Sequence, residues 1–271
     1  QVAALTAAQV PKLTTTQVAA LTATQVVGLE TADLAALDSS QLRALNVSAL
    51  AALSTAQVAA ITTAQVSKLS ETQVQSLTAA QVTAMSGAQL KELTTSQVAA
   101  MSAAQVKAIE TADLAQMSTA QLQSLSNAAV AALSTGQVAA LTTEQTAKLT
   151  TAQVSALTNT QITALTTAQA GALTTAQAAV LTATQVKAME TADLAQLAGA
   201  KIKTMSLSAV AALSADQITA LGTEQTSNLT TTQVAALSAT QVKALGTDDL
   251  AAFSSSQIQS LSASEIGRAH V

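Results

Sequence analysis

The chain has 271 residues, of which 49% are hydrophobic and 10% charged, with a net charge of −4 and a pI near 4.9. This combination argues against disorder, which favours low hydrophobicity and high charge. The basic residues are spread along the chain without aromatic partners, which argues against a nucleic-acid partner. The lack of cysteine excludes disulfides and thiolate metal sites. No apolar run reaches the length of about 18 residues that spans a membrane.

An eight-residue repeat with the consensus QVxxLTxx organises the chain. From Gln1 to Ser264 the sequence divides into 33 blocks, which we call octads, without insertion or deletion. Position 5 is apolar in all 33 octads, and position 2 is Val, Ile or Leu in 29. Position 1 is Gln in 25, and position 6 is Ser or Thr in 25. The four exceptions at position 2 are Thr146, Ala170, Ala178 and Thr226. A fixed period over this length predicts a single repeat array over residues 1–264.

The apolar spacing predicts one short helix and one sharp turn in every octad. Spacings of three and five do not fit the two-residue period of a half-buried strand, whereas three suits a helix face. A single continuous helix fails, because eight residues at about 100° each would rotate the apolar stripe by roughly 80° per octad. The sequence therefore predicts an all-α fold built from short helices.

The helix boundaries follow from a capping box. A Ser or Thr at position 6 and a Gln three residues later can satisfy each other's backbone N–H groups, as in Thr150 with Gln153 and Thr158 with Gln161. Each helix should begin at position 6 and end near position 4 or 5 of the next octad. Capping by itself is sufficient to explain the spacing of the glutamines.

The charged residues support the same boundaries independently. Of fourteen acidic residues before the tail, thirteen lie at positions 6, 7, 8 or 1, and Glu92 is the exception. Of ten basic residues, nine lie at positions 3 or 4, and Lys201 is the exception. This distribution complements a helix macrodipole.

Helices this short are unstable alone and persist by stacking on their neighbours. We therefore expect a narrow, elongated α-solenoid with positions 2 and 5 inside, in which Pro11 interrupts the hydrogen bonds of one helix. The scarcity of aromatic residues also indicates a thin core. A β-solenoid is the alternative, since Thr and Val favour strands, but the alanines and the apolar spacing argue against it.

One longer phrase raises the question of a metal site. "QVVGLETADLAAL" at Gln25 returns in similar form at Gln105 and Gln185, 80 residues apart, with a looser copy at Gln241. It contains the acidic pairs Glu30/Asp33, Glu110/Asp113 and Glu190/Asp193. These pairs could bind calcium weakly, but two carboxylates are few for that ion. We interpret them as favourable charge at helix starts and expect no metal site.

The remaining candidates for chemistry have structural interpretations. All five methionines occupy position 5, where they serve as pliable core residues rather than haem or copper ligands. They are Met85, Met101, Met117, Met189 and Met205. An ice-binding threonine array would need a uniform position 7, and that position varies. With no cysteine and only one histidine, His270, we expect no catalytic residue, no cofactor and no enzyme activity.

The last seven residues, EIGRAHV from Glu265, leave the repeat. They resemble a translated sequencing adapter, so we interpret residues 265–271 as an artefact in which Arg268 and His270 have no function. The chain also starts in mid-phrase, which suggests a fragment of a larger protein.

The phrases "LSTAQVAAI" at Leu53 and "ETADLAAL" at Glu30 resemble octapeptide repeats of very large bacterial surface or secreted proteins, often named automatically as adhesion or haem-utilisation proteins. The resemblance implies an extracellular or cell-surface setting in a Gram-negative bacterium. We expect a structural spacer whose partners are the neighbouring repeats of the parent protein. The alternative is a repetitive binding module for a protein, a glycan or ice.

Overall fold

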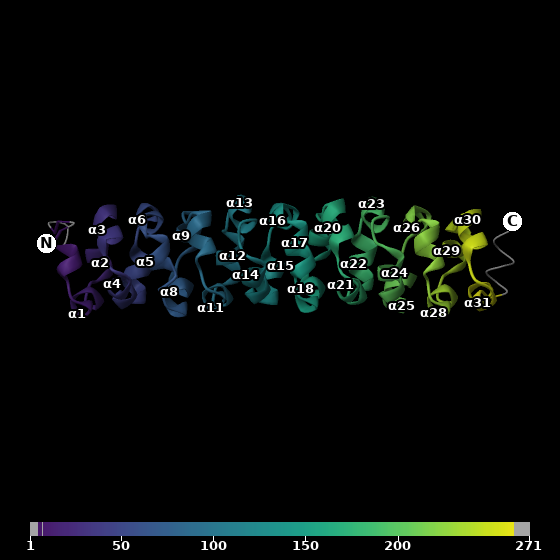
Figure 1. Ribbon diagram of the computed structural model, residues 1–271, viewed down its shortest axis with the longest axis horizontal. Helices are drawn as coiled ribbons and strands as arrows, with labels where there is room; N and C mark the ends of the chain where they lie inside the picture. The colour runs from purple at the N-terminus through teal and green to yellow at the C-terminus, as the bar shows by residue number, and fades with distance from the viewer. Residues whose placement is uncertain (1–4, 7, 263–271) are drawn as a thin grey trace. The chain divides into compact units, whose positions relative to one another are not determined.

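The computed structural model describes residues 5, 6 and 8–262 (Figure 1). These residues form short helices joined by tight turns, and they contain no strand, so the β-solenoid alternative is wrong. The chain divides into two compact units, Gln1–Ala140 and Leu141–Val271. The tail from Glu265, with Arg268 and His270, lies outside the described residues.

The first unit contains one 3-10 helix and sixteen α-helices within the described residues. They are η2 (Val10–Lys12), α1 (Thr15–Ala19), α2 (Ala23–Val26), α3 (Thr31–Ala36), α4 (Ser39–Ala44), α5 (Val47–Ala52), α6 (Thr55–Ala60), α7 (Thr63–Val66), α8 (Glu71–Ser76), α9 (Ala79–Thr83), α10 (Gly87–Lys91), α11 (Thr95–Ala99), α12 (Ala103–Lys107), α13 (Thr111–Leu114), α14 (Thr119–Ser124), α15 (Asn127–Ala132) and α16 (Thr135–Ala140).

The second unit continues the series in its described part. Its helices are α17 (Thr143–Lys148), α18 (Thr151–Ala156), α19 (Asn159–Thr163), α20 (Thr167–Ala172), α21 (Thr175–Ala179), α22 (Ala183–Ala188), α23 (Thr191–Leu194), α24 (Gly199–Thr204), α25 (Leu207–Ala211), α26 (Ala215–Ala220), α27 (Thr223–Ser227), α28 (Thr231–Ala235), α29 (Ala239–Ala244), α30 (Thr247–Ala252) and α31 (Ser255–Ser260).

Helix α6 illustrates how an octad folds. Its N-cap Ser54 accepts a hydrogen bond from the backbone N–H of Gln57 at 3.2 Å, and the Gln57 side chain accepts one from the Ser54 N–H at 2.8 Å. The helix ends at Ala60, position 4, and Ile61 follows with extended angles of φ −60° and ψ 128°. The start predicted from the capping box is therefore confirmed, while the described helices end between positions 2 and 4, somewhat earlier than the predicted position 4 or 5.

The turn between helices consists of two extended residues, at positions 5 and 6. At the start of α6 these are Leu53 and Ser54, the second with φ −68° and ψ 160°. No described residue, glycine included, has a positive φ. The turn therefore needs no left-handed residue, which explains how the array can be built with few glycines.

Pro11 changes its helix more than the sequence suggests. Instead of lying deep inside an α-helix, it is the second residue of the single 3-10 turn η2. Proline has no backbone N–H and cannot donate inside an α-helix, so the element shortens to three residues.

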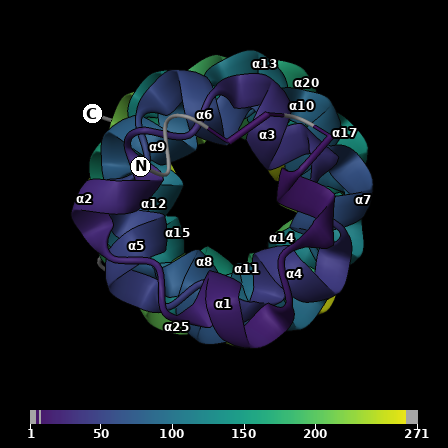
Figure 2. The same cartoon turned by 90° about the vertical axis from the view of Figure 1, so that its left-hand side faces the viewer.

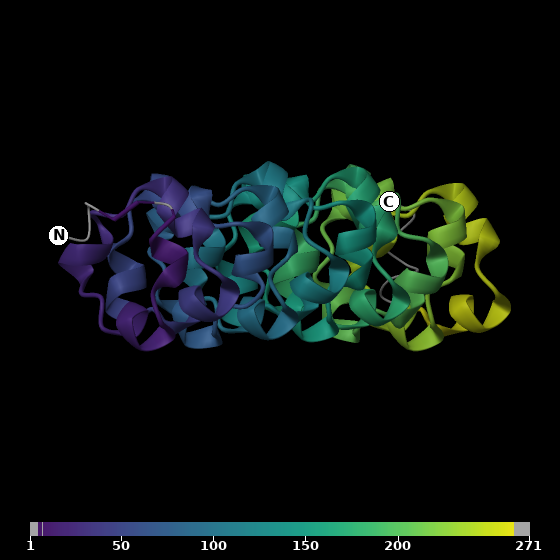
Figure 3. The ribbon, with the colours of Figure 1, turned by 60° about the vertical axis from the view of Figure 1, so that its left-hand side comes forward.

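Within each unit, a helix packs against the helix three octads further along. In the first unit α4 contacts α1 and α7, and α7 contacts α10. In the second, α20 contacts α17 and α23, and α23 contacts α26. Figure 2 shows the helices of the first unit, purple to teal, following one another around a ring. Figure 3 shows successive turns of the second unit, green to yellow, side by side. This pattern is typical of solenoids, in which each repeat contacts only nearby repeats.

Positions 2 and 5 form the core, as predicted, except close to the ends of the described chain. In α11 and the turn after it, Val98 is fully buried and Met101 is 4% exposed. All five methionines are buried, and so are the four position-2 exceptions, Thr146, Ala170, Ala178 and Thr226. The Thr146 hydroxyl donates to the carbonyl of Thr142 at 3.0 Å, which satisfies it inside the core. None of the described helices is long and apolar enough to cross a membrane.

Candidate functional site

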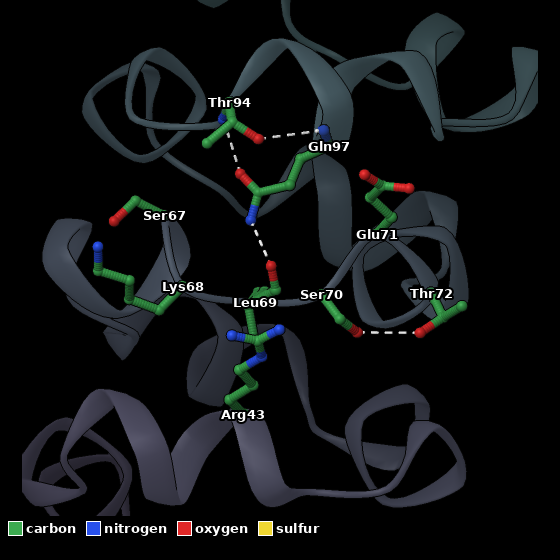
Figure 4. Close-up of a pocket in the computed structure, with 9 residues that line it drawn as sticks. All are labelled: Arg43, Ser67, Lys68, Leu69, Ser70, Glu71, Thr72, Thr94 and Gln97. Carbon is green, nitrogen blue, oxygen red and sulfur yellow. Dashed lines mark hydrogen bonds between the residues drawn. The ribbon is translucent and has the colours of Figure 1, made fainter.

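The glutamine at position 1 has a second role that links one turn of the solenoid to another. Gln97 is 2% exposed, and its Oε1 accepts from the backbone N–H of Thr94 at 2.7 Å. Its Nε2 donates to the carbonyl of Val66 at 3.0 Å and to that of Leu69 at 2.7 Å, the second of which is drawn in Figure 4. Val66 is the last residue of α7 and Leu69 follows three residues later; the Val66 carbonyl also accepts from the backbone N–H of Leu69 at 3.2 Å. One side chain thus completes the start of α11 and the end of α7.

We call this bond set the amide bridge. In eighteen glutamines at position 1 the Nε2 donates to the carbonyl 28 residues earlier, over 2.6–2.8 Å, and most of them also donate to one 31 or 30 residues earlier. The glutamines are Gln41, Gln57, Gln65, Gln73, Gln81, Gln89, Gln97, Gln105, Gln121 and Gln137 in the first unit, and Gln169, Gln177, Gln185, Gln217, Gln225, Gln233, Gln241 and Gln257 in the second. Each helix packs against the helix three octads further along the chain, and each amide bridge connects a glutamine to carbonyls four octads earlier. One turn of the solenoid therefore contains between three and four octads.

Capping alone is therefore an incomplete explanation of the glutamines. A capping box accepts Glu as readily as Gln at this place. Position 1 nevertheless contains 25 Gln, four Asp, three Ala and one Lys, and no Glu. Only the amide combines the acceptor needed for capping with the N–H donor needed for the carbonyls. The absence of Glu was the signal that the sequence offered.

Where the glutamine is missing, another donor can replace it. Position 1 is Ala49 in α5, and there the side chain of Asn46 donates to the carbonyls of Leu21 at 2.8 Å and Ala19 at 3.2 Å. At Lys201, the basic residue that departs from the charge pattern, Nζ donates to the carbonyl of Gly171 at 2.6 Å. This hydrogen bond explains why Lys201 lies at the start of a helix.

A missing cap is also replaced from another turn. The N-cap of α24 is Ala198, which has no side-chain oxygen. The Glu224 carboxylate, three octads later, accepts from the N–H of Gly199 at 3.1 and 3.0 Å. A Cβ there would lie 2.5 Å from Nδ2 of Asn228 and 2.7 Å from Oε1 of Glu224, so a larger residue would displace these side-chain ends, the replacement cap included.

The acidic pairs lie at helix starts, each within one helix. Asp33 accepts from the N–H of Glu30 at 3.1 Å. The related Asp249 accepts from the N–H of Gly246 and from the hydroxyl of Thr226, both at 3.0 Å. In α13 and α23 the N-caps Glu110 and Glu190 have no side-chain capping bond. In the described part of the chain, no three His, Cys, Asp or Glu residues come together as a metal site.

Asp193 differs from the other aspartates at position 1. It is 1% exposed, and its Oδ2 has no hydrogen-bond partner. Burial raises the pKa of the Asp193 carboxyl above its ordinary value, while a hydrogen bond from Thr167 acts in the opposite direction and the charge of Glu190 adds to the increase.

An open groove of about 410 Å³ lies beside the amide bridge of Gln97 (Figure 4). Arg43, Lys68, Glu71 and Thr94 contribute to its lining, and among the described residues neither cation forms an ion pair. A second groove of about 380 Å³ lies 160 residues further on, with Lys203 at the place of Arg43. Both are open grooves with a lining of mixed polar and apolar atoms.

Three segments match the family model of the ALTTAQ repeat: residues 26–63, 106–143 and 186–223. The matches begin 80 residues apart, which is the period of the long phrase in the sequence. No curated protein sequence matches the chain. The chain is thus similar to a repeat family, and the similarity supports a repetitive structural module.

Proposed function

We propose that this array is a structural spacer, or stalk, of a bacterial cell-surface or secreted adhesin-like protein. The observation that carries the proposal is the amide bridge: helices pack against helices three octads away, and glutamines at position 1 bond to carbonyls four octads back, in a pattern that recurs along each unit. Such an array grows by whole octads while its local bonding stays the same. A spacer needs this property, because its length can change without a change of fold.

The extracellular setting and the absence of catalysis belong to the same proposal. The support for the setting is the resemblance of "ETADLAAL" and related phrases to large surface proteins. A spacer acts through its length and rigidity, so specific recognition would reside in other domains of the parent protein.

The test removes residues 105–184, which are ten octads, so that Ala104 is followed by Gln185. We expect small-angle X-ray scattering to show a shorter maximum dimension, in proportion to the octads removed, with unchanged helicity per residue in circular dichroism. A matched control removes residues 105–108, which breaks the octad register and should lower both helicity and melting temperature. A ten-octad deletion that unfolds, or leaves the maximum dimension unchanged, contradicts the proposal.

A binding module is the second candidate, and the paired grooves favour it. Arg43 and Lys203 occupy equivalent places in them and present cationic side chains among hydroxyl groups. Such a surface suits a carboxylated polysaccharide. Isothermal titration with alginate should then show binding that the double variant Arg43→Ala/Lys203→Ala loses; absence of binding to the unmodified chain removes this candidate.

A further inference from the structure

Helix α23 is a point where the amide bridge cannot form in the usual way. Counting back 28 and 31 residues from Asp193 gives Leu165 and Ile162, the carbonyls that a glutamine would serve. Helix α20, whose first residue Thr167 comes two residues after Leu165, packs against α23, and Thr167 interacts with the Asp193 carboxyl. An ionised aspartate is acceptor-only and has no hydrogen to donate to the carbonyls.

The surroundings of Asp193 disfavour a negative charge. The helices that pack against α23 are α20 and α26. Helix α20 has no ionisable residue, and α26 contributes only the acidic Asp216. The N-cap of α23 itself is Glu190, another acid. No cation on these elements compensates the carboxylate, and carbonyl oxygens add further negative potential.

A matched aspartate shows the contrast. Asp249 is also buried, at 7% exposure, and it occupies the equivalent position in the looser copy of the phrase. Both of its oxygens accept a hydrogen bond, from Gly246 and from Thr226. At Asp193 the corresponding capping bond from Glu190 is missing, and Oδ2 stays without a partner at 1% exposure. An orphaned buried oxygen of this kind is rare in native structures.

We propose that Asp193 is a proton-binding site of the folded array, in which its neutral carboxyl replaces the glutamine amide. A proton from solvent forms an O–H bond at Oδ2, and this hydroxyl donates to a carbonyl of the Ile162–Leu165 turn. Loss of the proton removes the donor and places a negative charge against the carbonyls, so the connection between α19 and α23 loosens. This role is separate from that of a spacer.

The sign of the pH dependence follows from burial. Because burial raises the pKa of Asp193 in the folded chain, the proton-bound form adds stability that is fully present below the ordinary aspartate pKa of 3.8. That stability is lost as the pH rises through the folded-state pKa. The region around α23 should therefore have a higher local free energy of unfolding in acid than at neutral pH. An aspartate held by ion pairs would give the opposite pH dependence.

The first experiment uses the full chain and compares it with Asp193→Gln, which restores the consensus residue. Melting followed by circular dichroism from pH 4 to pH 8 should show the unmodified chain losing about 2–4 °C relative to Asp193→Gln as the pH rises. Asp249→Asn is the matched control and should keep the pH dependence of the unmodified chain. Equal pH dependence in the unmodified chain and Asp193→Gln overturns the proposal.

The second experiment reads the site directly. Carboxyl ¹³C resonances of the full chain are followed against pH, and Asp193 is assigned by the signal that Asp193→Gln removes. A midpoint above 3.8 supports the proton site, and one at or below 3.8 overturns it. The same titration is repeated with calcium and with chelator. If calcium binds at this site, it should lower the midpoint and raise the melting temperature, and Asp193→Gln should abolish that rise. This result would identify a cation site instead of a proton site and would also overturn the proposal.

Discussion

The amide bridge makes a quantitative prediction for Gln97→Ala. The substitution removes three hydrogen bonds, one from the N–H of Thr94 at 2.7 Å and two to the carbonyls of Val66 and Leu69 at 3.0 and 2.7 Å. A buried hydrogen bond contributes about 0.5–1.5 kcal/mol net, so we expect a loss of about 2–4 kcal/mol in the local free energy of unfolding. The upper part of this range applies because groups in a 2%-exposed environment lose their partners.

Gln97→Glu separates the two roles of the side chain. Glutamate keeps the acceptor for the N–H of Thr94 but has no donor for Val66 and Leu69, and at neutral pH it buries a charge. It should therefore destabilise at least as much as alanine at pH 7 and recover part of the loss in acid, where the protonated carboxyl can donate.

The assay is native-state hydrogen exchange, combined with urea unfolding, because a repeat array need not unfold as one unit. Exchange should accelerate at the N–H of Thr94 and in α7, two places separated by almost a full turn. The matched control is Gln75→Ala, the same chemical change at an exposed position 3, expected to stay within about 0.5 kcal/mol. A cost for Gln97→Ala no greater than that of Gln75→Ala would refute the bridging role.

Three further predictions concern the core and the caps. Leu93→Ala at the 4%-exposed position 5 should cost about 2–5 kcal/mol in urea unfolding, and a cost below 1 kcal/mol would show that the thin core collapses around the cavity. Glu224→Ala should lower the free energy of unfolding by about 1 kcal/mol and accelerate hydrogen exchange at the N–H of Gly199, which loses its acceptor. Unchanged exchange at Gly199 would show that Glu224 does not act as the cap of α24. Thr146→Val at a 1%-exposed position 2 should raise the melting temperature slightly, because valine suits the core and leaves no hydroxyl to satisfy; a drop would mean that the bond to Thr142 outweighs the apolar gain.

The start and end of each helix could be predicted because their causes lie within one octad. The Ser54–Gln57 capping box is local, and so is the apolar pair at positions 2 and 5. The partner of Gln97 is different, since it lies 28–31 residues away. That separation depends on how many octads complete a turn, and an eight-residue period leaves this number open.

The exceptions also needed the three-dimensional arrangement. Ala198 is a weak cap by sequence, and nothing nearby in the chain compensates it; Glu224 does so from three octads later. Asp193 has the same neighbours in sequence as Asp113, yet only the packing of α20 and α26 shows how deeply it is buried. Long-range compensation of this kind leaves little trace in a local pattern.

The turn between helices has a consequence for how such a chain evolves. Its two residues adopt extended angles open to any L-amino acid, and no described residue needs a positive φ. Substitutions at the exposed positions, proline excepted, therefore meet no backbone barrier. A crossover between misaligned DNA copies of the repeat can also join any octad to any other, and the new junction has the same backbone conformation as the old one. The coding sequence can thus lengthen or shorten in single recombination events while the encoded protein remains foldable at every step.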